Sequence, residues 1–202
     1  MSRIVLIGAG GHGKVVAETA EACGYEDVVF HDQNWPELKS NGRWQIIGGP
    51  QLPNIADGSE ALFCSIGNNA VREKIFNEYE LEQCPILIHP STVLSPSARL
   101  GAGTLVVAGA IINADATLGL GCILNTACSV DHDCVLGDFV HISPGARLAG
   151  NVTIGSRSWI GIGAVVKEGV TIGSDVMVAA GAAVVTDIKD GERVGGVPAQ
   201  QI

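Results

Sequence analysis

The sequence predicts two domains of different construction, an α/β domain over residues 1–89 and a parallel β-solenoid over residues 90–202. Two observations lead to this prediction. A glycine-rich turn follows the first apolar stretch of the chain, and an aliphatic side chain recurs at every sixth position of the second half. Three prolines separate the two patterns, as is typical of a linker: Pro85, Pro90 and Pro96.

The first half alternates strand and helix patterns. Arg3–Ile7 is a short apolar run typical of a buried parallel strand, and apolar residues recur at helical spacing over Lys14–Cys23. Asp27–His31 is the second expected strand, Ala61–Ile66 the third, and Ala70–Glu80 the second helix. This alternation predicts a parallel sheet covered by helices, so the first half should form a Rossmann-like domain.

The second half is an internal repeat. From Leu94 to Val184, sixteen positions spaced six residues apart are all aliphatic, and the residues two places before them are mostly small. A hexapeptide repeat of this kind forms a solenoid in which each hexad supplies one short strand and one corner. An aliphatic–glycine pair also recurs every eighteen residues, so three hexads close one triangular coil. Stacked coils then bury a continuous apolar column.

Composition excludes several functional classes. The 202 residues carry 12 basic and 21 acidic side chains, a net charge of −9, which disfavours a nucleic-acid-binding protein. The longest uncharged runs are about 15 residues and rich in Gly, Ala and Asn, whereas a membrane span needs roughly 20 apolar residues. The first residues lack the long apolar stretch of a secretion signal, so a cytoplasmic location and six free cysteines are expected.

The glycine-rich turn Gly8–Gly13 joins an expected strand to an expected helix, where Rossmann-like domains bind phosphate groups. Asp32 stands about twenty residues further on, at a position where an acidic side chain binds a ribose. The first half is too short to hold a full dinucleotide fold, so a nucleotide-bearing ligand is favoured over NAD. A plain tight turn is the alternative, because this motif alone is weak evidence.

A histidine between two acidic residues is the candidate catalytic group of the solenoid. His132 has acidic neighbours on both sides, and His141 follows nine residues later. An imidazole beside a carboxylate is suited to act as a general base near neutral pH. Adjacent strand residues point to opposite faces, so a contact between His132 and Asp133 requires a bend of the backbone. A polar triplet at a solvated corner is the alternative interpretation.

Other polar or aromatic residues of the solenoid have a structural explanation. Cys122, Cys128 and Cys134 lack the spacing of metal ligands and fall on the small inward position of the repeat, so core packing is expected. Asn125 follows an inward aliphatic residue and is expected to face outward, either in a corner hydrogen bond or near a ligand. Trp159 is also out of the inward phase and is expected to cover a subunit surface.

Four segments together resemble one family over essentially the whole chain: GAGGHGKV, SIGNN, ILNTACSVDHDCVLGDFVHISPGARLAGNVTIG and a terminal GVPA. They resemble bacterial sugar acyltransferases of the sialic acid O-acetyltransferase type. Within that group they are most similar to the UDP-4-amino-sugar N-acetyltransferases of the bacillosamine pathway. The resemblance implies a left-handed β-helix, a homotrimer, a UDP-amino-sugar held by the N-terminal domain, and acetyl-CoA between adjacent subunits.

The resemblance also implies roles for individual residues. His132 would be the general base and Asp133 the carboxylate that raises its basicity, although Glu is the expected residue there. The substrate would bind at Gly10, Gly11, His12, Asp32, Gln33, Gly67, Asn68 and Asn125. Acetyl-CoA would lie along His141, Ile162 and Ala180.

The implied reaction is a direct attack of the sugar's 4-amino group on the thioester of acetyl-CoA, without an acyl-enzyme and without a metal. Two alternatives stay open. A protein of the same fold could acetylate a hydroxyl group of a sugar such as sialic acid, or it could bind a nucleotide sugar without catalysis.

Overall fold

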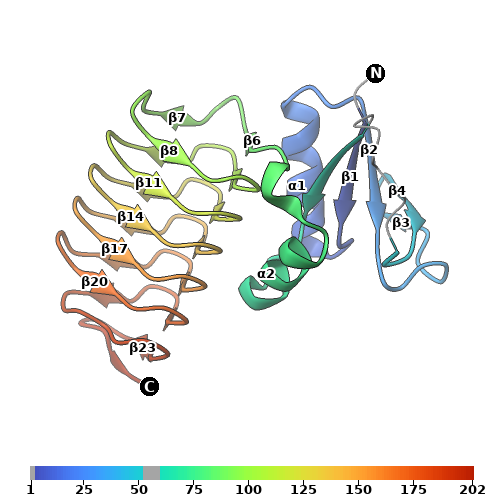
Figure 1. Ribbon diagram of the computed structural model, residues 1–202. Coiled ribbons are helices and arrows are strands. Elements are labelled where there is room, and N and C mark those ends of the chain that lie inside the picture. The colour runs from blue at the N-terminus through green and yellow to red at the C-terminus, as the bar shows by residue number, and fades with distance from the viewer. Residues whose placement is uncertain (1–2, 52–59) are drawn as a thin grey trace.

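The computed structural model describes residues 3–51 and 60–202, and it consists of a small α/β domain attached to one side of a long β-solenoid (Figure 1). The predicted fold class is confirmed, because a Rossmann-like domain precedes a parallel β-helix of hexapeptide repeats. Within the described ranges, no helix combines the length and the hydropathy that crossing a membrane would require.

The N-terminal domain is built on a five-stranded sheet with the strand order β3-β4-β2-β1-β5. Its strands are β1 (Arg3–Ile7), β2 (Asp27–His31), β3 (Ser40–Asn41), β4 (Trp44–Gly48) and β5 (Glu60–Cys64). Strand β1 pairs in parallel with β2 and with β5, as the alternating pattern predicts. The antiparallel pair β3 and β4 extends one edge of the sheet, and the sequence pattern does not predict it.

Among the described residues of this domain there are three helical segments: α1 (Gly11–Ala22), α2 (Asn69–Glu78) and the short 3-10 helix η1 (Leu81–Gln83). Helix α1 begins three residues before the expected start, because the glycine-rich turn itself forms the first helical turn. Gly8 has a φ of +105°, a conformation that residues with a Cβ rarely adopt. This turn places the N-terminus of α1 directly at the end of β1.

Three parallel sheets form the sides of the solenoid. Sheet 1 contains β6 (Leu87–Ile88), β9 (Leu105–Val106), β12 (Ile123–Leu124), β15 (His141–Ile142), β18 (Trp159–Ile160), β21 (Met177–Val178), β23 (Arg193–Gly195) and the antiparallel β24 (Gln200–Gln201). Sheet 2 contains β7 (Val93–Leu94), β10 (Ile111–Ile112), β13 (Ser129–Val130), β16 (Arg147–Leu148), β19 (Val165–Val166) and β22 (Ala183–Val184). Sheet 3 contains β8 (Arg99–Leu100), β11 (Thr117–Leu118), β14 (Val135–Leu136), β17 (Thr153–Ile154) and β20 (Thr171–Ile172).

The inward phase of the repeat is confirmed. Every sixth residue from Val106 to Val184 is buried, whereas Leu94, in the open first coil, is 36% exposed. These side chains, together with the small residues two places before them, form the apolar column inside the triangular coils. Removal of this apolar surface from water is the main force that holds the solenoid together.

The cysteines of the repeat belong to this column. Cys122, Cys128 and Cys134 are buried and free, and the other three cysteines are free as well. The thiols of Cys122 and Cys134 each donate to a backbone carbonyl fifteen residues later, at 3.2 Å, and the hydroxyl of Ser158 does the same at 2.6 Å. These thiols therefore serve in core packing, as expected, and in hydrogen bonds between coils.

The N-terminal domain packs against sheet 1 and against the corners between sheets 3 and 1. Leu105 and Ile123, which point outward from sheet 1, belong to the apolar core of the N-terminal domain. Phe76 of α2 meets Phe139 of a corner, with ring centroids 5.4 Å apart. Strand β6 already pairs with β9, ahead of the boundary expected between residues 89 and 90. The apolar core of the N-terminal domain thus extends onto the outer face of sheet 1 and stays separate from the column inside the coils.

Candidate active site

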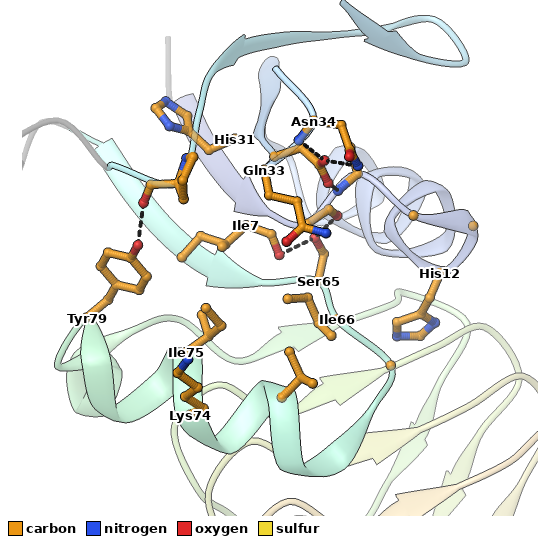
Figure 2. A pocket seen from close by; sticks show the side chains of 18 residues that line it. Ile7, His12, His31, Gln33, Asn34, Ser65, Ile66, Lys74, Ile75 and Tyr79 are labelled. Atoms are coloured by element: carbon orange, nitrogen blue, oxygen red, sulfur yellow. Dashed lines mark hydrogen bonds between the residues drawn. The ribbon is translucent and has the colours of Figure 1, made fainter. Parts of the chain in front are cut away.

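A cavity of about 600 Å³ opens at the C-terminal end of the N-terminal sheet, between the glycine-rich turn and α2 (Figure 2). Rossmann-like domains bind nucleotides at this edge of the sheet, and the volume is typical of a small-molecule site. Six of the predicted substrate-binding residues line it: Gly10, Gly11, His12, Asp32, Gln33 and Gly67.

The backbone of the glycine-rich turn forms one wall of the cavity. Among the described residues, no side chain caps the N-terminus of α1, and a Cβ on Gly10 or Gly11 would meet no atom within 4 Å. A Cβ on Gly13, in contrast, would lie 2.7 Å from the carbonyl oxygen of Gly8. Gly13 is therefore required by the turn itself, whereas Gly10 and Gly11 leave the backbone open to a phosphate group.

Asp32 fixes this wall from the end of β2. One of its carboxylate oxygens accepts a hydrogen bond from the backbone N–H of Ala9 at 2.7 Å. The other accepts from the backbone and side-chain nitrogens of Asn34, both at 2.9 Å. The carboxylate thus holds the glycine-rich turn and the turn after β2 together. Gln33, in the turn after β2, is exposed and lines the cavity (Figure 2).

The opposite wall comes from α2, which the motifs did not single out. Lys74, Ile75 and Tyr79 line the cavity, and the Tyr79 hydroxyl donates to the backbone carbonyl of Pro50 (Figure 2). A helix that follows a parallel strand begins at this same edge of the sheet. These residues could therefore have been predicted from the sequence, because they lie on the predicted second helix, on the face directed at the ligand-binding edge of the sheet.

His12 lies at the inner end of the cavity and faces the solenoid. Its ring centroid is 6.0 Å from that of His141, which stacks on Trp159 at 4.4 Å and accepts a hydrogen bond from Asn125 at 3.2 Å. Within the described part of the chain, His12 Nε2 and His141 Nδ1 are buried without a hydrogen-bond partner. Burial, assisted by the nearby guanidinium of Arg72, lowers the pKa of His12 to about 4 and that of His141 to about 3, so both rings are neutral near pH 7.

The remaining expected ligand contacts do not line this cavity, although His141 lies beside its inner end. His141, expected along acetyl-CoA, is 4% exposed beneath the N-terminal domain. Asn68 caps α2 by accepting from the backbone N–H of Val71, and it borders a smaller second cavity. Ile162 and Ala180 are exposed and lie at corners between sheets 1 and 2.

The expected catalytic pair lies at a corner between sheets 2 and 3. His132 Nδ1 is 2.8 Å from the Asp133 carboxylate, and Asp133 has a φ of +59°, so the bend that this contact requires is present. Because a carboxylate only accepts hydrogen bonds, Nδ1 carries the hydrogen and Nε2 keeps its lone pair. The hydrogen bond to Asp133, together with the charges of Asp131 and Asp133, raises the pKa of His132 above its usual value of 6.5.

Gly150 supports the His132 ring from the next coil. A Cβ at this position would lie 2.5 Å from Cε1 and Nε2 of the imidazole. The backbone N–H of Asn151 donates to the carbonyl of His132 at 2.9 Å and joins the same two corners. This contact could have been predicted from the eighteen-residue repeat, because residue 150 stands one coil after residue 132.

Two further kinds of chemistry can be examined in the structure, a bound metal ion and a cysteine nucleophile. Within residues 3–51 and 60–202, no group of three or more His, Cys, Asp or Glu side chains could hold a metal ion. Burial raises the pKa of all six thiols, to about 12 for Cys122 and Cys128. The thiols are therefore protonated at neutral pH and poor nucleophiles.

Comparison with known protein families agrees with both halves of this fold. Residues 3–79 match the PglD N-terminal domain, and residues 151–185 match the bacterial transferase hexapeptide with six repeats. Fold and site together define a hexapeptide-repeat transferase with an N-terminal domain of the PglD type.

Individual relatives narrow the class to a family. The chain is 42% identical to the acetyltransferase domain of PglB from Neisseria gonorrhoeae FA1090, with a TM-score of 0.93 and complete coverage of both chains. It is 40% identical to PerB from Caulobacter crescentus in complex with CoA and GDP-perosamine, with a TM-score of 0.90 over 100% of this chain and 98% of that one. The chain belongs to this family of bacterial sugar N-acetyltransferases, as the motifs predicted.

A curated relative is similar over a shorter region. UDP-N-acetylbacillosamine N-acetyltransferase from Bacillus subtilis (strain 168) is 34% identical over 119 residues. The aligned region spans 54% of this chain and 52% of that protein, about half the length of each.

Asp133→Asn should lower the pKa of His132, because it removes the negative charge that stabilises the imidazolium ion. The measurement is an NMR titration of the His132 ring signals, assigned with a His132→Gln variant. Asp115→Asn is the matched control, since Asp115 also has a positive φ and lies at the same corner one coil earlier. An equal His132 pKa in both variants would contradict the assignment of Asp133 as its main partner.

Proposed function

We propose that the protein transfers the acetyl group of acetyl-CoA to the 4-amino group of an amino sugar linked to a nucleoside diphosphate, with UDP as the nucleotide. One observation carries the proposal. A nucleotide-sized cavity beside an uncapped helix N-terminus occurs in a chain that is similar over its whole length to sugar N-acetyltransferases, solved with acetyl-CoA and with CoA plus GDP-perosamine.

In this proposal residues 1–89 bind the nucleotide sugar and residues 90–202 carry out the transfer. The phosphate groups bind the open backbone N–H groups at Gly10 and Gly11 and the N-terminus of α1. The remaining substrate contacts are made by His12, Asp32, Gln33, Gly67, Asn68 and Asn125. Lys74 adds a positive charge at the cavity of a protein whose net charge is −9.

His132 acts as the general base. Its Nε2 takes a proton from the sugar amine as the amine nitrogen bonds to the thioester carbonyl carbon, while Asp133 stabilises the imidazolium ion that forms. Backbone N–H groups polarise the carbonyl oxygen, and the tetrahedral intermediate then breaks its carbon–sulfur bond. Coenzyme A leaves as the thiolate and takes up the proton from the imidazolium ion of His132, which restores the neutral base. The high pKa values of the cysteine thiols support direct transfer without an acyl-enzyme.

The active assembly in this proposal is a homotrimer. His132 lies at a corner between sheets 2 and 3, which in a triangular coil is opposite sheet 1, where the N-terminal domain packs. Ile162 and Ala180, the proposed acetyl-CoA contacts, lie at corners between sheets 1 and 2. A complete site therefore requires the His132 corner of one chain to meet the cavity of another. A threefold ring repeats this contact at every interface.

The protein should acetylate a UDP-linked 4-amino sugar and leave the matching 4-hydroxyl sugar unchanged, because the amine is the better nucleophile toward a thioester. The measurement is release of the coenzyme A thiol, with the product identified by mass spectrometry. GDP-linked 4-amino sugar serves as the comparison for the nucleotide. Acetylation of the hydroxyl compound would favour an O-acetyltransferase, and binding of the nucleotide sugar without transfer to either acceptor would favour a non-catalytic role.

His132→Ala should lower kcat by roughly 10²–10⁴-fold, the usual contribution of a positioned general base. Both substrates should still bind, since the imidazole acts mainly in the transition state. Steady-state kinetics together with calorimetric binding of UDP and acetyl-CoA check this. His89→Ala is the control, because His89 is a half-buried histidine at the start of the first coil, and this variant should retain full activity. An unchanged kcat in His132→Ala would refute its role as the base.

Two inactive variants should complement each other if the site is shared between subunits. Gly11→Trp blocks the cavity of its own chain, and His132→Ala removes the base of its own chain. When the two chains are co-expressed and mix at random, about a quarter of the sites should be intact. In these sites the cavity comes from a His132→Ala chain and the base from a Gly11→Trp chain. Activity is measured on the purified mixed assembly. No recovery in an assembly shown to contain both chains would place cavity and base in one subunit and contradict the shared site.

A further inference from the structure

Arg72 of α2 is only 1% exposed, although arginine is almost never fully buried unless it is paired. Its guanidinium donates hydrogen bonds of 2.7–3.1 Å to five oxygen atoms. The acceptors are the backbone carbonyls of Ile66, Gly67, Gly121 and Phe139 and the side-chain oxygen of Asn69. None of these five is a carboxylate, so the charge is held by dipoles alone.

The acceptors belong to both domains. Ile66 and Gly67 follow β5 and line the cavity of the N-terminal domain. Gly121 and Phe139 lie eighteen residues apart, at successive corners between sheets 3 and 1 of the solenoid. A guanidinium presents its donors in one plane at fixed angles, so it sets the relative position of all its acceptors. Arg72 thus joins the wall of the cavity to two coils of the solenoid.

Helix α2 continues along the same corners to a third coil. The side-chain nitrogen of Asn69 donates to the carbonyl oxygens of Arg157 at 2.8 Å and Ser158 at 3.2 Å. The guanidinium of Arg157 in turn lies 3.0 Å from the carboxylate of Glu73 on α2. These contacts keep α2, and with it one wall of the cavity, in register with the coils.

This register matters for a reaction between groups held by different parts of the fold. In the proposed function the N-terminal domain binds the sugar. The solenoid of one chain or its neighbour binds the acetyl donor and carries the base His132. A misplacement of about 1 Å between reacting groups can cost roughly 100-fold in rate. A buried charge of this kind is weak evidence for a gain in stability, and it fits better with a role in orientation.

We propose that Arg72 is a positioning residue for acetyl transfer, which locks the wall of the nucleotide-sugar cavity to the solenoid and so sets the distance between the sugar amine and the acetyl group. The inference rests on the proposed function and deepens it. The charge of Arg72 has a second effect in the same place, because it favours the neutral forms of His12 and His141 at the inner end of the cavity.

The test separates binding from transfer. Arg72→Lys keeps the positive charge but loses the planar fork, and kcat with the UDP-linked 4-amino sugar should fall roughly 10–100-fold. The Kd of UDP, which probes the cavity, and the Kd of acetyl-CoA, which probes the solenoid, should stay near the wild-type values. Arg43→Met is the matched control, because Arg43 is an exposed arginine of the same domain that pairs with Glu21. It should leave kcat unchanged.

A second variant keeps the test decisive if Arg72→Lys fails to fold. Asn69→Ala removes one partner of Arg72 and two hydrogen bonds to the solenoid, and it should show a smaller fall in kcat with the same unchanged affinities. A wild-type kcat in the folded variants would overturn the proposal, and so would a fall in kcat matched by an equal loss of UDP or acetyl-CoA affinity. Absence of transfer by the wild-type protein would refute the proposed function itself.

Discussion

The hydrogen bond between one coil and the next is the interaction on which the rest of the structure depends. The backbone N–H of Ile123 donates to the carbonyl of Val140 at 2.9 Å, and the same step of seventeen residues recurs along the solenoid. It keeps residues eighteen apart stacked in columns parallel to the axis. The neighbours of a side chain in the adjacent coils are therefore the residues eighteen positions before and after it. For this reason the ring of His132 lies over the backbone of Gly150.

This stacking also decides how chemical groups are distributed. A triangular coil has three corners, and a side chain at one corner does not reach the sheet opposite. The N-terminal domain covers sheet 1, while the His132–Asp133 pair lies at the far corner, so the folding of one chain does not bring them together. The buried hydrogen bonds of Arg72 on α2 hold the wall of the cavity at a defined place on the coils.

The parts of the fold with a regular period were predictable, and so were β1 and β2, which have the expected bounds. The start of α1 was missed because glycine has a low helix propensity, and the β3–β4 pair because its first strand has only two residues. In the site, the sequence indicated that a contact between His132 and Asp133 requires a bend, and the structure has both the bend and the contact. The burial of His141 and of Arg72 did not, since both depend on contacts between domains that no local pattern records.

The N-terminal domain covers only the first coils of sheet 1, where Leu105 and Ile123 are buried, and it leaves Met177 of a later coil 37% exposed. This sets a rule for how such a chain can change in length. Six extra residues would turn every later side chain onto the neighbouring face, whereas eighteen would return each one to its original face. A gain or loss of residues within the solenoid therefore keeps each later side chain on its original face only when it comes in whole coils.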